Sequence, residues 1–197
     1  MDIREKFVNQ AQAFEPIFND VFGAKRQADD EDATIALLLF DQAESPEKAD
    51  LTGNIDNLEK VFDVVQLQTE MMIEFVRATV GPILSNLTEN ENQKDDEILP
   101  MLMFVHEKMI KLHNQLDFFF SSFEEEDLKK GFSIARRSAT SVKFNKNPEK
   151  DQVIAFIRNL RSKTTAYLKN VSDLHDWLHG MLDILDGELN KNTNVEA

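Results

Sequence analysis

The chain has 197 residues, of which 42% are hydrophobic, and its 22 basic and 36 acidic side chains give a formal net charge of −14. The apolar content excludes a disordered chain, and the acidity argues against nucleic-acid binding, because phosphate contacts require a basic surface. Cysteine is absent, which excludes disulfides, thiolate metal sites and cysteine nucleophiles.

The N-terminal residues, the longest apolar run and the spacing of the glycines indicate the location of the protein and the ligands that it can bind. The first residues, MDIREKFVNQ, contain no apolar signal segment, and the longest apolar run, 35–40, is far shorter than the roughly 18 residues that span a bilayer. We therefore expect a cytoplasmic protein without a transmembrane segment. The six glycines are too far apart to form a phosphate-binding loop. We expect no cofactor, no enzymatic activity and a single domain over residues 1–197.

Residues 1–53 favour short, irregular helices. Apolar residues recur at helical spacing, with a break expected at Glu15-Pro16. These residues are Ile3, Phe7, Phe14, Ile17 and Val21. A second short helix is expected over 31–43, between polar loops at 23–30 and 44–53.

A long helix is predicted from about Thr52 or Asn54. Its apolar stripe steps by three and four residues through Ile55, Leu58, Phe62, Val65, Thr69, Met72 and Val76. Gly81-Pro82 is expected to kink or end this helix, because proline cannot donate to the carbonyl four residues earlier. A polar loop over 89–96 follows.

Two further long helices show the same heptad-like spacing. The first starts near Asp95 or Asp96, and its stripe is Ile98, Leu102, Val105, Met109, Leu112, Leu116, Phe119 and Phe123. The second is predicted over 148–189 after an N-cap at Asn147, and its stripe is Val153, Ile157, Leu160, Thr164, Tyr167, Val171, Leu174, Leu178, Met181 and Leu185. Gly187 or the asparagine-rich tail should end it, and 190–197 should be a flexible tail.

Together these elements predict an all-α fold, an elongated antiparallel helical bundle. It comprises three long helices, a broken N-terminal helix and a short helix. The apolar faces are wider than a two-position seam, which favours a core of four to five helices. The same apolar surface would permit a homo-oligomer.

All four histidines fall on the last two long helices, in two pairs whose members share a helix face. His106 and His113 are seven residues apart, and His175 and His179 are four apart. They are candidate ligands of a transition metal, since imidazole suits zinc, iron, copper and nickel. His175 and His179 are the first choice, because a histidine pair at this spacing can chelate one ion.

Carboxylates could complete such a site. Asp117 follows His113 by four residues, and Glu70 and Glu74 form a pair on the first long helix. The HxxxH and HxxxD spacings resemble the helix-borne ligand pairs of hemerythrin-like di-iron bundles, although those proteins use more histidines than this chain has. The alternative is purely structural: each histidine bonds a neighbouring carboxylate at a helix edge and holds no metal.

Segment 128–146, LKKGFSIARRSATSVKFNK, is basic, whereas the rest of the chain has 16 basic and 36 acidic residues. Its basic residues are Lys129, Lys130, Arg136, Arg137, Lys143 and Lys146. They are candidate contacts for an anion or a protein partner. The alternative is an inter-helix connection whose charges pair with neighbouring acidic helices. Because so long a structureless loop is unusual in a compact domain, part of 128–141 should be helical.

The leading hypothesis from these features is a non-catalytic helical bundle that binds a protein partner. Acidic clusters at predicted helix ends, 29–32, 95–97 and 124–127, would steer a basic partner, and the basic segment would provide a second contact. A histidine/carboxylate metal-binding bundle, di-iron-like or zinc, is the alternative. An acidic decoy that mimics nucleic acid is the third hypothesis.

Overall fold

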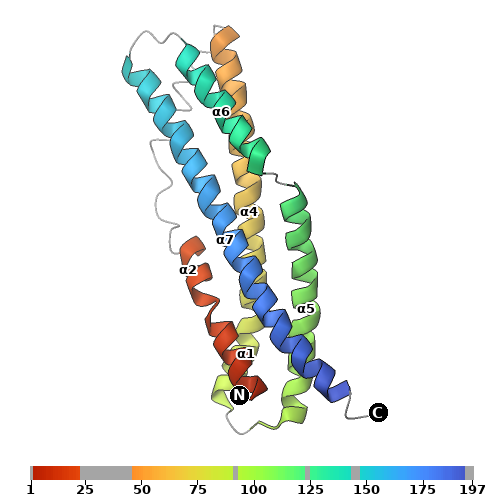
Figure 1. The fold of residues 1–197 in the computed structure, drawn as a ribbon. Coiled ribbons are helices and arrows are strands. Elements are labelled where there is room, and N and C mark those ends of the chain that lie inside the picture. Colours follow the sequence, from red (N-terminus) through yellow and green to blue (C-terminus); the bar gives the residue numbers. More distant parts are fainter. Residues whose placement is uncertain (1, 23–45, 91–92, 123–124, 143–146, 194–197) are drawn as a thin grey trace. The chain divides into compact units, whose positions relative to one another are not determined.

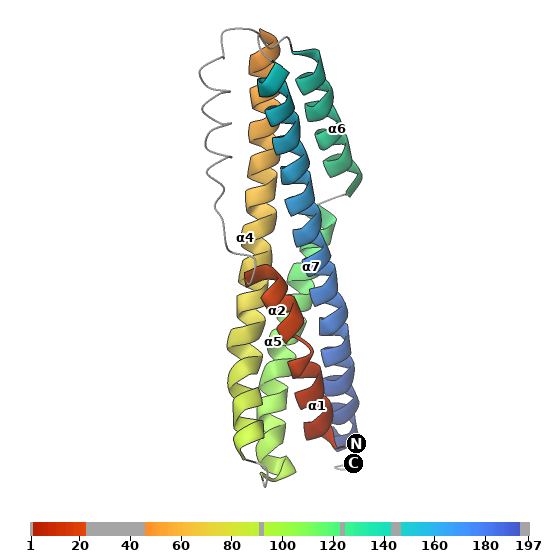
Figure 2. The same cartoon turned by 90° about the vertical axis from the view of Figure 1, so that its left-hand side faces the viewer.

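The computed structural model describes residues 2–22, 46–90, 93–122, 125–142 and 147–193. Over these ranges every regular element is an α-helix (Figures 1 and 2). The helices are α1 (Ile3–Gln12), α2 (Glu15–Phe22), α4 (Pro46–Glu89), α5 (Asp95–Ser122), α6 (Glu125–Ser141) and α7 (Asn147–Thr193). The predicted all-α class is confirmed, with three long helices and an N-terminal helix that is broken before Glu15.

Some predicted helix boundaries were wrong. α4 begins at Pro46, so residues 46–53, predicted as part of a loop, are helical. It also continues through Pro82, because the apolar stripe resumes beyond it with buried Ile83 and Leu87. α7 passes Gly187 and ends at Thr193, so 190–193 are helical rather than part of a tail. The predicted short helix over 31–43 and the loop over 23–30 lie outside the described residues.

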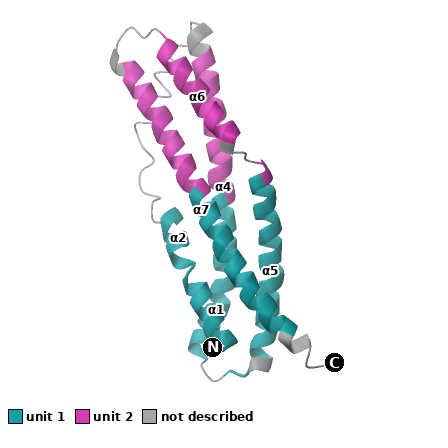
Figure 3. Ribbon diagram, in the orientation of Figure 1, with its two compact units in different colours: residues 1–24, 69–120, 169–197 teal, residues 25–68, 121–168 magenta. Residues whose placement is uncertain are grey.

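The described helices group into two compact units (Figure 3). Unit 1 comprises Met1–Ala24, Thr69–Phe120 and Lys169–Ala197, and unit 2 comprises Lys25–Gln68 and Ser121–Leu168. α4 and α7 each contribute one part to each unit. Among the described helices, none combines the length and the apolar character that a membrane crossing requires.

Unit 1 is built on the predicted seams of α4, α5 and α7. Its fully or almost fully buried side chains include Met72, Val76, Leu102, Val105, Met109, Leu112, Leu116, Leu174, Leu178, Met181 and Leu185. A reciprocal pair of hydrogen bonds fastens α1 to α7. Trp177 Nε1 donates to the carbonyl of Gln10 at 2.6 Å, and Gln10 Nε2 donates to the carbonyl of Trp177 at 2.7 Å.

In unit 2, α6 packs one face against α4 and α7. Phe132, Ala135 and Ala139 join a buried cluster with Leu51, Ile55 and Leu58 of α4 and with Val153, Phe156, Ile157 and Leu160 of α7. The expectation of a helix within 128–141 is therefore confirmed, and the basic segment is an amphipathic helix rather than an extended connection. Its Ile134 is 38% exposed, and Phe144 lies outside the described residues.

Candidate metal centre

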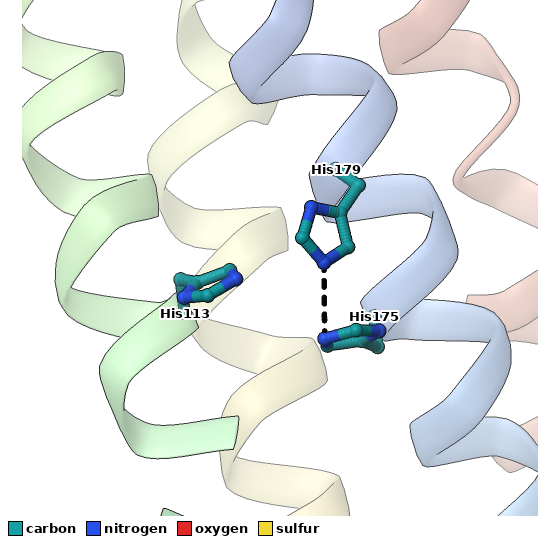
Figure 4. A group of neighbouring side chains, drawn as sticks. All are labelled: His113, His175 and His179. Atoms are coloured by element: carbon teal, nitrogen blue, oxygen red, sulfur yellow. Dashed lines mark hydrogen bonds between the residues drawn. The ribbon is translucent and has the colours of Figure 1, made fainter. Parts of the chain in front are cut away.

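Three of the four histidines converge in unit 1 (Figure 4). His113 comes from α5, whereas His175 and His179 lie one turn apart on α7. One ring nitrogen of each residue lies within 4.8 Å of those of the other two. The rings therefore face one another across two helices that are far apart in the sequence.

The hydrophobic seams position these rings. Each histidine directly follows a leucine that is completely buried, namely Leu112, Leu174 and Leu178. Because successive helical residues differ by about 100° around the axis, a residue next to a seam position lies at the edge of the core. His113 and His175 are accordingly half-buried, and His179 is exposed. The cluster therefore lies at the edge of the core and is accessible to solvent.

The spacing of the rings is close to that of metal ligands. His175 Nε2 and His179 Nε2 are 3.1 Å apart, and one donates a hydrogen bond to the other. The ring centroid of His113 is 4.9 Å from that of His179 and 5.8 Å from that of His175. Nitrogen ligands around tetrahedral zinc, at 2.0–2.1 Å from the ion, are about 3.3 Å apart. The three nitrogens lie within 4.8 Å of one another, so His113 would have to move closer to the other two to share an ion with them.

Carboxylates flank two of the rings on the side of Nδ1. Asp117 Oδ2 lies 3.3 Å from His113 Nδ1, where a carboxylate can orient the ring. Asp176 Oδ1 lies 3.9 Å from His175 Nδ1, which is too far for a hydrogen bond. Asp117 is therefore placed to orient a ligand rather than to bind the ion itself.

The surroundings of His175 favour its neutral form. The pKa of His175 is lowered from its ordinary value of 6.5, first by burial and then by the neighbouring His179 and His113. Asp176 and Asp117 oppose this effect more weakly. A metal binds the neutral ring, so the same crowding that disfavours protonation prepares His175 as a ligand.

The other candidate ligands lie elsewhere. His106 Nε2 pairs with Asp186 Oδ1 at 2.6 Å, and this contact also joins α5 to α7. Glu74 forms a long ion pair with Arg77, 3.8 Å between Oε1 and Nη1. Neither His106, Glu70 nor Glu74 belongs to the described group of potential ligands that contains His113.

The structure also locates several of the basic and acidic residues that are candidate partner contacts. Lys129, Lys130, Arg136 and Arg137 are all exposed on α6, whereas Lys143 and Lys146 lie outside the described residues. The acidic runs at 95–97 and 125–127 occupy the first turns of α5 and α6. Negative charge there stabilises a helix through its dipole, which explains these runs without a partner. The cluster at 29–32 is not described.

The sequence predicted one site that joined His106, His113 and Asp117 of one helix to His175 and His179 of the next. Among the described residues the structure brings His113, His175 and His179 together, whereas His106 pairs with Asp186 instead. Comparison with known proteins adds no further constraint: no protein-family model matches the chain, and no significant similarity to a curated protein or a solved structure is found.

Proposed function

We propose that the protein binds one divalent transition-metal ion, with zinc the best suited, through His113, His175 and His179. The observation that supports this most is the approach of three ring nitrogens to within 4.8 Å in a chain with only four histidines. Three imidazoles are a known zinc ligand set, and they leave a fourth position for water or another small ligand.

The alternative, in which each histidine pairs with a neighbouring carboxylate and holds no metal, fits His106 better than it fits His175 and His179. His106 has its carboxylate, Asp186, at 2.6 Å. His175 and His179 instead hydrogen-bond to each other. A mutual contact of this kind requires at least one neutral ring as acceptor, and it holds the two Nε2 atoms at nearly the separation of two nitrogen ligands on one ion.

Zinc titration of the untagged, chelator-treated protein by isothermal calorimetry at pH 7.5 tests the proposal. The wild type should bind one zinc ion per chain. His113→Gln and His179→Gln should each weaken binding at least about tenfold, because each removes one of three ligands. His106→Gln is the matched control and should bind as the wild type does. Absence of zinc binding, or equal losses in all three variants, would refute the proposal.

The hypothesis of a protein partner is supported by one further observation, the exposed basic side chains of α6. Lys130 and Arg137 are seven residues apart and lie on the side of the helix opposite buried Ala135 and Ala139. Lys129 and Arg136, also seven apart, lie between that side and the buried one. We propose that this surface contacts an acidic peptide segment.

Fluorescence anisotropy with a labelled glutamate-rich peptide tests this second proposal. The double variant Lys130→Glu/Arg137→Glu should abolish binding, and rising salt should weaken it in the wild type. Arg158→Glu/Arg161→Glu, two exposed positions on α7 of the same unit, is the matched control. Equal loss in both double variants would indicate a response to net charge alone and would overturn the assignment to α6.

A further inference from the structure

Unit 1 contains a second candidate site, a cavity of about 310 Å³ where α1 and α2 meet α4. Its lining shares no residue with the histidine cluster. The residues that line it are Ala11, Gln12, Phe14, Glu15, Phe18, Asn19, Arg77, Val80, Gly81 and Leu84. This volume is at the lower end of the range for small-molecule sites, so it would hold a single ring or a short chain.

The α4 wall of the cavity contains a glycine where a side chain could stand. Arg77, Val80, Gly81 and Leu84 follow the spacing i, i+3, i+4, i+7 and so form one face of α4. A Cβ added at Gly81 would meet nothing within 4 Å. Glycine inside a helix costs about 1 kcal/mol relative to alanine, and here it also leaves apolar walls unfilled. A ligand that filled the cavity would offset both costs.

The walls define the chemistry of such a ligand. Phe14, Phe18, Val80 and Leu84 provide apolar surface, and Arg77 provides a cation. The guanidinium carbon of Arg77 lies 4.6 Å from the centre of the Phe18 ring, which positions the charge beside the apolar wall.

Two carboxylates, Glu74 and Glu15, affect how many anionic groups a ligand of this cavity can carry. Glu74 contacts Arg77 only at 3.8 Å, which is too long for a good hydrogen bond. Arg77 therefore retains donors for a ligand. Glu15 also lines the cavity, and its negative charge opposes a second anionic group.

We propose that this cavity binds a small apolar monocarboxylate, with its carboxylate on Arg77 and its hydrocarbon part against Phe14, Phe18 and Leu84. An aromatic or short aliphatic acid meets both requirements. The neutral amide of the same acid fills the same volume but lacks the charge, so it should bind about tenfold more weakly.

Calorimetric titration with phenylacetate, octanoate and phenylacetamide tests the assignment. The wild type should bind at least one of the two acids, and should prefer phenylacetate to its amide. Gly81→Leu should abolish acid binding by filling the cavity. Gly187→Leu is the matched control, because residue 187 is also a helical glycine of unit 1 whose Cβ would meet nothing within 4 Å. Arg77→Gln should remove the preference for acid over amide.

Three results would overturn the proposal: no saturable binding of either acid by the wild type, undiminished binding by Gly81→Leu, or equal binding of acid and amide by the wild type. Circular dichroism establishes that each variant is folded. Gly81→Ala, a smaller change, should weaken acid binding less than Gly81→Leu does. The single tryptophan gives a second readout, because the ring centroid of Trp177 lies 5.1 Å from that of the cavity residue Phe14.

Discussion

His113 of α5 and His179 of α7 place their imidazole rings edge to face, with ring centroids 4.9 Å apart. His175, one turn before His179 on α7, completes the group. Since the ligands come from two helices, a bound ion would cross-link α5 and α7 within unit 1. Binding to the native but not the unfolded state would also raise the free energy of unfolding, by about 2.7 kcal/mol at a hundred times the Kd.

Asp117→Asn should weaken zinc binding without removing a ligand. The carboxylate lies 3.3 Å from His113 Nδ1, and a charged acceptor there orients the ring and increases its basicity. Loss of such a partner typically lowers metal affinity about 10- to 100-fold. The zinc Kd measured by chelator competition checks this. Asp186→Asn, which alters the partner of His106, should leave the Kd unchanged, and an equal effect of both would contradict the role of Asp117.

The metal-free protein should lose stability as the pH falls below about 6.5, in part through His175. Its folded-state pKa lies below 6.5 because burial, His179 and His113 disfavour its protonation, while Asp176 and Asp117 oppose the shift. The unfolded chain therefore binds more protons in this window, and stability rises with pH through it. Urea unfolding at pH 5 and 7.5 should show a smaller difference for His175→Gln than for the wild type. An NMR titration of the His175 ring at or above pH 6.5 would contradict the account.

An alanine at residue 180 should have an effect that depends on Gln10. A Cβ there would lie 2.6 Å from Gln10 Nε2, the atom that donates to the carbonyl of Trp177. Gly180→Ala gains about 1 kcal/mol of helix propensity but disrupts a hydrogen bond of similar value, so its net effect should be small. In the Gln10→Ala background the same change should stabilise by about 1 kcal/mol. Urea unfolding measures both, and equal effects in the two backgrounds would argue against this contact.

Phe132→Ala should destabilise unit 2 by about 3 kcal/mol or more. Its side chain is only 6% exposed and joins the cluster between α6, α4 and α7, so truncation leaves a cavity. Ile134→Ala, two residues away on the exposed side of α6, should cost about 1 kcal/mol at most. Urea unfolding followed by circular dichroism compares the two, and similar losses would contradict the packing of α6.

The buried face of each long helix could be predicted from the sequence. Every described residue of the α5 stripe is buried, and in α7 the exception is Tyr167, which is half-buried and meets Phe62 edge to face at 5.7 Å. This agreement has a simple cause: apolar periodicity records which side of a helix faces the core. The helix-breaking residues Pro82 and Gly187 were less reliable guides, since the helix continues through both. Beyond Pro82, buried Ile83 and Leu87 pack the continued helix.

The candidate site depends on information that periodicity does not contain. The spacing of four correctly placed His175 and His179 on one face of the helix, where their Nε2 atoms meet. The register between α5 and α7 determines that His113, rather than His106, lies opposite them. That register arises from the interlocking of side chains across the seam, and single-helix patterns do not specify it.

The coordination of zinc, measured by X-ray absorption on the stoichiometric zinc protein, tests the central claim most directly. We expect three imidazole nitrogens and one further nitrogen or oxygen ligand at about 2.0–2.1 Å. We also expect that one imidazole is lost in His113→Gln and none in His106→Gln. A spectrum dominated by oxygen ligands, or one that His113→Gln leaves unchanged, would contradict a metal centre formed by His113, His175 and His179.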